Sequence, residues 1–596
     1  MIALAPLLLG PWSVPAPTPV AQDELLFSLW IEDAAACLTD PKDARLVEAL
    51  RLIDDRVIEL PAELPGFPPL PPEAIQLAAH VLTGRKSVRV LASDDPSLMV
   101  PFYGQLDLLE EDPEQAGALA ASILELARSA GVPLGEPDLD GLVPVHAPVD
   151  VPIRMGARGS NVVLSVGRTI DEPPLPDADA LPPGARPALA MHLDLGLAFE
   201  TLGGLMALGA PEEADQLLDF AEASGLHGMV VDLVLGMDAE RSYTVTRMPG
   251  YAAILRDIGT LPVRGLEASD VALVPADATW ASVGTYNAQG TLEMVLSILP
   301  RPLAEEGLED PIEALAAMTG FHLRADLVDY LGPVYGAYSS DTTGGGGLLS
   351  LVVFLEITDA DGMLGTVEML QGIVDRLGSA KAKGYVGTRS WEMDGADLLS
   401  VVFPGIPIPA EPTLAVTPRH LVIGMTPQAT LAALEHMGSG GQGLQAHESF
   451  TSELPASVEG AYAVTWADTP RLAREGYGLT SLLCSAIANG TRSPKDAGRD
   501  GGVVLPSFHE LVKGARPAVG LTRVIGDDML IESRGDGSLL VNVAGGIGML
   551  SASPVGILVP LAIGGAFVGA RQEAMRRAEW EYLEAEPVPD GGYQDR

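Results

Sequence analysis

The sequence is poor in cysteine and in basic residues, and each shortage excludes a class of protein. Cys37 and Cys484 are the only cysteines. Two cysteines are too few for a disulfide framework or a thiolate metal site, although they could form one disulfide bond with each other. Lysine and arginine total 36 against 80 acidic residues, a net charge of −44. A nucleic-acid-binding protein needs basic side chains to neutralise phosphates, so we expect no nucleic-acid partner.

Catalytic motifs are also missing. The sequence contains no GxSxG elbow and no GxxxxGK[ST] phosphate loop. The stretch Ile357–Glu368 resembles a calcium loop, but Ile357 stands where the first carboxylate ligand belongs. His509 lacks a second histidine four residues on, because that position is Lys513. His192 lies among apolar residues of an expected strand, as a core histidine does. We therefore expect no enzyme, no metal and no cofactor.

The chain is too long, at 596 residues, for a single hydrophobic core, so several domains are expected. Its first 22 residues form a short apolar run followed by prolines and small residues, which is typical of a secretory signal and its cleavage region. The run lacks the usual basic residues at its start. The alternative is a frayed tail or a strand of the first domain.

The C-terminal region predicts a membrane anchor. No residue between Asp536 and Arg571 is charged, and 549–570 is long enough to cross about 30 Å of hydrocarbon. Arg571, Arg576 and Arg577 follow, and such residues favour the cytoplasmic side. We therefore expect an extracytoplasmic body, one transmembrane helix and an acidic tail, 571–596, in the cytoplasm. The alternative for 549–570 is a buried hairpin or helix of the last domain.

One local pattern occurs three times along the chain. A proline-led turn, a short strand, a capping Asn or Asp and a helix are expected from Leu181 to Asp194, from Val274 to Asn287 and from Leu454 to Asp468. Runs of strand pairs mixed with helices are typical of the α+β class. We predict three or four related lobes of antiparallel sheet packed with helices.

The expected lobes and connections follow from composition. Strands are predicted at 25–31 and 100–108, a helix begins after Asp112, and a Pro- and Asp-rich stretch and a Gly-rich stretch separate lobes. The predicted segments are 1–22 (signal), 23–168 (first lobe), 169–187 (linker), 188–268 (second lobe), 269–437 (third lobe), 438–453 (linker), 454–542 (fourth lobe), 549–570 (membrane span) and 571–596 (tail).

The repeated pattern, together with Gly320–Gly332 and the hairpin and helix of Pro412–Leu434, resembles a family of bacterial proteins catalogued as a domain of unknown function. Members are exported or membrane-attached, so the resemblance implies an envelope location. It covers about residues 181–540 and implies no catalytic residues.

We expect from these patterns a non-catalytic, membrane-tethered protein of the cell envelope that binds another protein or organises the envelope. A carrier or sensor of an apolar ligand is the alternative, and a hydrolase whose carboxylates meet only on folding is the third. The candidate binding groove consists of aromatic residues that alternate with small ones on the repeated strands: Trp280, Tyr286, Tyr462 and Trp466.

Overall fold

The computed structural model describes residues 24–33, 37–63, 84–93, 102–146, 152–167, 170, 180–207, 209–298, 316–317, 319–345, 347–381, 383–393, 396–405, 410–492 and 505–552. The strands of the first part of the chain are β1 (Glu24–Ile31), β2 (Lys86–Ala92), β3 (Phe102–Leu109), β4 (Val143–Val145), β5 (Ile153–Arg158), β6 (Asn161–Val166), β7 (Arg186–Asp194), β8 (Val230–Met237) and β9 (Arg241–Met248). Those of the second part are β10 (Ala278–Thr285), β11 (Leu331–Ser340), β12 (Leu351–Ile357), β13 (Gly387–Met393), β14 (Ala396–Val402), β15 (Thr413–Val416), β16 (His420–Gly424), β17 (Ala463–Ala467), β18 (Ala518–Ile525) and β19 (Asp528–Asp536).

The α-helices used below are α2 (Ala44–Glu63), α4 (Pro113–Ser129), α5 (Leu195–Ala207), α6 (Pro211–Ala223), α7 (Tyr251–Asp257), α8 (Ala268–Val271), α9 (Ala288–Ile298), α11 (Leu323–Asp326), α12 (Ala360–Lys381), α13 (Pro427–Ser439), α14 (Glu448–Glu453), α15 (Thr469–Thr491), α16 (Phe508–Val512) and α17 (Leu539–Ala552). Mixed helix and antiparallel sheet confirm the predicted α+β class.

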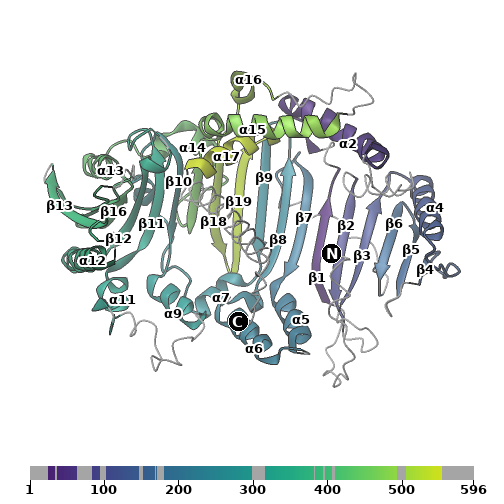
Figure 1. Ribbon diagram of the computed structural model, residues 1–596, viewed down its shortest axis with the longest axis horizontal. Coiled ribbons are helices and arrows are strands. Elements are labelled where there is room, and N and C mark those ends of the chain that lie inside the picture. Colours follow the sequence, from purple (N-terminus) through teal and green to yellow (C-terminus); the bar gives the residue numbers. More distant parts are fainter. Residues whose placement is uncertain are drawn as a thin grey trace, which may run out of the picture.

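All 19 described strands join one antiparallel sheet (Figure 1). Following the pairings from edge to edge, the order is β4-β5-β6-β3-β2-β1-β7-β8-β9-β19-β18-β17-β10-β11-β12-β16-β15-β14-β13. Read outward from the central pair β9 and β19, the two halves have the same order of strands in sequence. The second half adds one strand to its outer meander.

Cross-strand register defines the two faces of the sheet, because directly paired residues point to the same side. One row runs through Trp30, Ala190, Val234 and Val245 and continues in the second half through Val464 and Val283. We call this side the Trp30 face and the opposite side, which carries Leu29, the Leu29 face.

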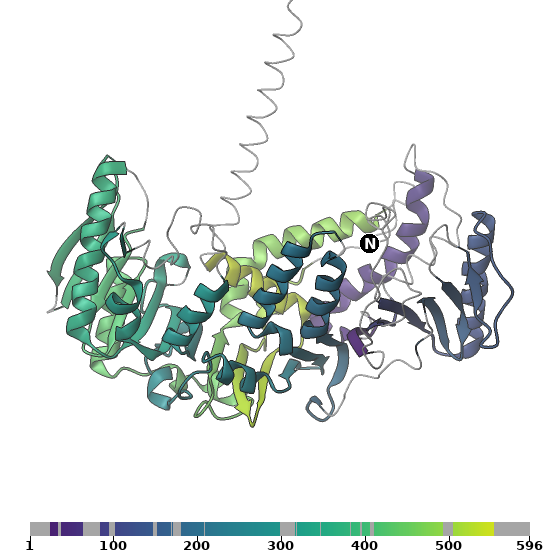
Figure 2. The ribbon, with the colours of Figure 1, turned by 90° about the horizontal axis from the view of Figure 1, so that it is seen from below.

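Helices cover the two faces unequally. The long helices α4, α12 and α15 pack on the Leu29 face, where their apolar residues meet the strands. Figure 2 shows these long helices gathered on one side of the sheet. On the Trp30 face, residues of α13 and α14 complete the largest apolar cluster, which includes Trp466, Phe354 and Phe450, and that cluster lies entirely in the second half.

The N-terminal helix α2 packs against the C-terminal helices α15, α16 and α17 through a separate apolar cluster. Asp43, immediately before α2, is fully buried and accepts hydrogen bonds from Ser538 Oγ at 2.9 Å, Leu539 N at 2.8 Å and Leu540 N at 3.0 Å. Asp43 thus caps α17 from the far end of the chain, because the first amides of a helix have no partner within it. The two ends of the described chain therefore depend on each other.

The capping residues of the repeated pattern are confirmed. Asp194, Asn287 and Asp468 each accept a hydrogen bond from the amide three residues on, at 2.9, 3.2 and 3.3 Å respectively. Asp112 caps α4 as predicted, and Thr426 caps α13. These short polar side chains fix helix starts locally, which is why the sequence alone predicts them.

Several expectations lie outside the described residues or meet a different local structure. Residues 1–22 and 571–596 are not described, and the expected span 549–570 is described only to 552, where it forms the end of α17. Among the described residues, no helix is long and apolar enough to span a membrane. The expected linker 438–453 contributes buried Leu444 and Phe450 to the core, because the chain crosses the sheet there.

Cys37 and Cys484 are both free thiols.

Candidate functional site

A groove of about 700 Å³ lies on the Trp30 face of the first half, where no described helix covers the strands. It crosses β1, β7, β8, β9 and β19, and Ala180 forms part of its wall. Polar and charged residues share its lining with apolar ones: Leu25, Ser28, Leu29, Trp30, Ser87, Ala180, Ala190, Met191, His192, Asp232, Leu233, Val234, Val245, Arg247, Ile525, Asp528, Leu530 and Glu532. A concave site with a few polar groups among apolar ones is the usual form of a binding site.

The central polar residue of the groove is His192. Its Nδ1 lies 2.7 Å from Asp232 Oδ1 on the adjacent strand, and its ring also hydrogen-bonds with the backbone of Leu25. The hydrogen bond with Asp232 raises the pKa of His192 above its ordinary value, although burial opposes the shift. The contact with Asp232 therefore favours the charged form of the imidazole, which donates at both nitrogens.

Ser28, His192 and Asp232 occupy directly paired positions on three neighbouring strands. This row has the residue types of a catalytic triad, but not its geometry. In a triad the second imidazole nitrogen accepts the serine proton, whereas here the ring makes its further hydrogen bond with the Leu25 backbone. The arrangement fits binding and strand-to-strand linkage better than nucleophilic catalysis.

The other charged groups at the groove are paired as well. Arg247 Nη2 lies 2.5 Å from Asp528 Oδ2, and Arg523 pairs with Glu532. Asp528 also accepts a hydrogen bond from Gly250 N at 3.0 Å, the main reason that its pKa is lowered. Pairing of this kind leaves polar atoms at the surface of the groove that can accept or donate hydrogen bonds.

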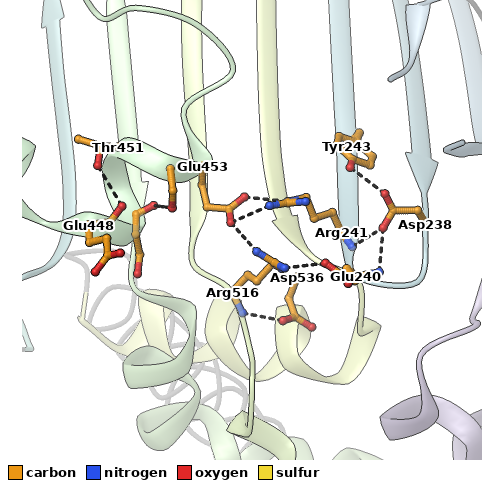
Figure 3. A network of polar contacts seen from close by, with 11 residues as sticks. Asp238, Glu240, Arg241, Tyr243, Glu448, Thr451, Glu453, Arg516 and Asp536 are labelled. Carbon is orange, nitrogen blue, oxygen red and sulfur yellow. Dashed lines mark hydrogen bonds and ion pairs between the residues drawn. The ribbon is translucent and has the colours of Figure 1, made fainter. Parts of the chain in front are cut away.

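Next to the groove, a second polar cluster joins the two halves of the sheet (Figure 3). Glu453 of α14 is 3% exposed and binds Arg241 of β9 through two hydrogen bonds of 2.9 and 3.1 Å. Arg516 donates to the same carboxylate at 2.7 Å and to Glu240 at 2.6 Å. The two arginines hold the pKa of Glu453 below its usual value despite the desolvation that raises it. This cluster is saturated by its own partners, so we assign it a structural role.

The carboxyl groups with raised pKa values do not form an acid pair. Burial raises the pKa of Asp43 and that of Asp468, and both side chains cap helices, α17 and α15 respectively. The calcium-like loop has the same explanation, since Asp359 accepts from the amides of Asp361 and Gly362 at the start of α12. Within the described ranges no group of three or more His, Cys, Asp or Glu residues is arranged to hold a metal ion.

The four aromatic residues predicted to line a groove are not brought together. Trp280 is paired with Ala467 and Trp466 with Ala281, so the two indoles lie on opposite faces and in separate apolar clusters. Trp466 Nε1 donates to Ala278 O at 3.0 Å, as a core residue does.

The two tyrosines are likewise engaged elsewhere. Tyr286 packs edge-on against Tyr335, and burial raises its pKa to about 12. The backbone carbonyl of Tyr462 accepts a hydrogen bond from Thr285 N, and its backbone amide donates to Thr522 O. The predicted groove is thus replaced by the one on β1, β7, β8, β9 and β19.

The sequence does contain a signal for the observed groove. Ser28 and Trp30 alternate with apolar Phe27, Leu29 and Ile31 along β1, the period of a strand with two unlike faces. Which strands lie beside β1 is a long-range property that this alternation cannot give. Comparison with models of protein families, with curated proteins and with solved structures finds no match to this chain.

Proposed function

We propose that this chain is a non-catalytic, membrane-tethered protein of the cell envelope whose sheet binds another protein. The observation that carries the proposal is the groove on the Trp30 face. In it His192 hydrogen-bonds with Asp232 and with the Leu25 backbone, and the other charged side chains are paired. Such a surface supplies hydrogen bonds and apolar contacts but no free base or nucleophile–base pair.

The tethering part of the proposal rests on sequence. The apolar segment 553–570 continues directly from α17, and we propose that 549–570 crosses the membrane with the body outside and the tail in the cytoplasm. We also propose that the four strand–helix–hairpin units, which begin at β1, β7, β10 and β17, are related lobes with one common plan. Their shared strand order supports this relation.

Membrane fractionation tests the anchor. Deleting 553–570 from the full chain, with α17 retained, is expected to release the body into the soluble fraction after cell breakage. Deleting 578–596 is the control, because it removes most of the acidic tail and keeps Arg571, Arg576 and Arg577. Membrane association that survives the first deletion would overturn the anchor.

Photo-crosslinking tests protein binding. A benzophenone amino acid at position 28, in the groove, is expected to form a discrete protein adduct in cells. The same amino acid at fully exposed Leu139 is the control position. Equal adducts at both positions, or none at position 28, would contradict the proposal.

The second candidate function is a carrier of an amphipathic small ligand, favoured by the volume of the groove, which lies in the range of about 300–1,000 Å³ typical of small-molecule sites. Native mass spectrometry of the full chain, released gently from detergent, separates the two functions. Extra mass of a lipid would favour the carrier, and a clean mass would favour protein binding.

A further inference from the structure

The groove consists of two parallel rows that run across the strands. Register places one member of each row on β1, β7, β8 and β9 in turn. One row is apolar apart from the indole nitrogen and the other is polar: Trp30, Ala190, Val234 and Val245 beside Ser28, His192, Asp232 and Arg247. The floor of the groove is therefore amphipathic across these four strands. On β19 the pattern reverses, because Glu532 is paired with Val245 and Leu530 with Arg247.

Trp30 offers an unused hydrogen-bond donor in this groove. Trp30 is 7% exposed, and its indole Nε1 is buried with no hydrogen-bond partner among the described residues. A buried indole N–H normally finds an acceptor, because leaving a polar group unpaired costs free energy. An acceptor supplied by a bound ligand would remove this cost.

The length and chemistry of the groove favour an extended peptide over a lipid chain. Five strands separated by about 4.8 Å span about 19 Å, the length of roughly six extended residues at 3.3 Å each. A hydrocarbon chain in the same place would desolvate His192, Asp232 and Arg247 without giving them hydrogen bonds. A peptide backbone can supply such bonds to the polar row while alternate side chains meet the apolar row.

Charge narrows the choice of peptide. The whole chain carries a net charge of −44. Among the described residues that line the groove, Asp232, Asp528 and Glu532 are acidic, and His192 and Arg247 are basic. A field of this sign attracts basic segments and repels acidic ones.

We propose that the groove binds an extended, neutral or basic peptide segment of about six residues with apolar side chains at alternate positions. One main-chain carbonyl of the segment accepts the hydrogen bond of Trp30 Nε1. This assignment rests on the proposed protein-binding function and names the kind of segment that the partner presents.

Fluorescence anisotropy with two labelled synthetic peptides tests the assignment. One peptide alternates valine with lysine and the other valine with glutamate, at equal length. The full chain is expected to bind the lysine peptide at least tenfold more tightly, and the difference should shrink at high salt. Binding of neither peptide, or equal binding of both, would overturn the assignment.

Variants locate the site. Trp30→Phe keeps the aromatic ring and removes the donor, and it should weaken binding of the lysine peptide about tenfold. The matched control is Trp391→Phe on the far edge strand β13, where no change is expected. Ser28→Leu fills the polar row without altering Trp30 and provides a second test if Trp30→Phe does not fold. Equal effects of Trp30→Phe and Trp391→Phe would contradict the site.

Failure of the peptide assignment can be distinguished from failure of the proposed protein-binding function. A crosslinked protein at position 28 with no binding of the lysine peptide would keep protein binding and reject the extended basic segment. A lipid found by native mass spectrometry that blocks the lysine peptide would reject both.

Discussion

The buried carboxylate of Glu453 allows the most direct test of how the two halves are joined. It accepts three hydrogen bonds from two arginines, Arg241 on β9 and Arg516 just before β18. Glu453→Gln keeps the shape of the side chain but removes its charge and turns one acceptor oxygen into an amide that faces an arginine. Two guanidinium groups then remain beside a neutral group.

The expected loss follows from burial. Removing one partner of a buried ion pair costs about 3–5 kcal/mol. Here the carboxylate is buried, but the arginine side chains are 29% and 30% exposed and can turn partly toward water. We therefore expect a loss of about 2–4 kcal/mol in the free energy of unfolding of the unit that contains α14. Glu448→Gln, on the exposed side of the same helix, should change it by less than about 0.5 kcal/mol.

Urea unfolding followed by circular dichroism measures the difference, with Glu453→Gln and Glu448→Gln compared at pH 7. The folded-state pKa of Glu453 is lowered, so its contribution is present above the unfolded pKa of about 4.3 and is lost as pH falls through the folded value. The two variants should therefore converge in acid. Equal midpoints at pH 7 would refute the role of Glu453 as the joint between the halves.

Three further predictions concern helix packing and the groove. Asp43→Ala should lower the free energy of unfolding by roughly 2–4 kcal/mol, measured in urea, because α17 loses its cap and buried donors are left unpaired. Gly548→Ala should lower the thermal midpoint, since a Cβ there would lie 1.9 Å from Leu472 O, whereas Gly546→Ala, which meets open space, should not. His192→Gln should destabilise the fold below pH about 6.5 and progressively less as pH rises through the raised folded pKa of His192, and a constant difference from pH 6 to 9 would contradict the raised pKa.

Local structure was predictable wherever a few neighbouring residues decide it. Asp112, Thr426 and the three capping residues of the repeated pattern fix helix starts through hydrogen bonds to amides only two or three residues away. Strand positions such as 25–31 follow from alternation. These features need no knowledge of the rest of the chain.

The pairing of the strands was not predictable. Because the groove is formed by that pairing, the sequence did not predict its position either. Trp280 and Trp466 have similar surroundings in sequence, but antiparallel pairing of β10 with β17 sets them on opposite faces. The helix α2 is stabilised by contacts with α15 and α17, which lie more than four hundred residues away. Its own sequence therefore shows little of its environment.

The groove is best understood as a difference between two halves with the same strand order. In the second half, the directly paired residues at the middle of β10 and β17 are Val283 and Val464, and both are buried under residues of α13 and α14. In the first half, the corresponding strands β1 and β7 pair Trp30 with Ala190 in this same row and Ser28 with His192 in the row beside it. Apolar residues require a covering layer, because their exposure to water is unfavourable, whereas the polar side chains of Ser28 and His192 do not.

On the Trp30 face of the first half, Val234 and Val245 pack against Leu181, so a short segment before β7 takes the place of the helices that cover the second half. Buried polar residues extend the same surface to the outer strands, where Arg89 binds Asp107 at 2.6 Å and Gln105 donates to Asp107 at 2.8 Å. A sheet that only needed to be stable would place apolar residues here, as the second half does. The polar side chains on β1, β7 and β8 are the reason that we base the proposed function of the chain on this surface.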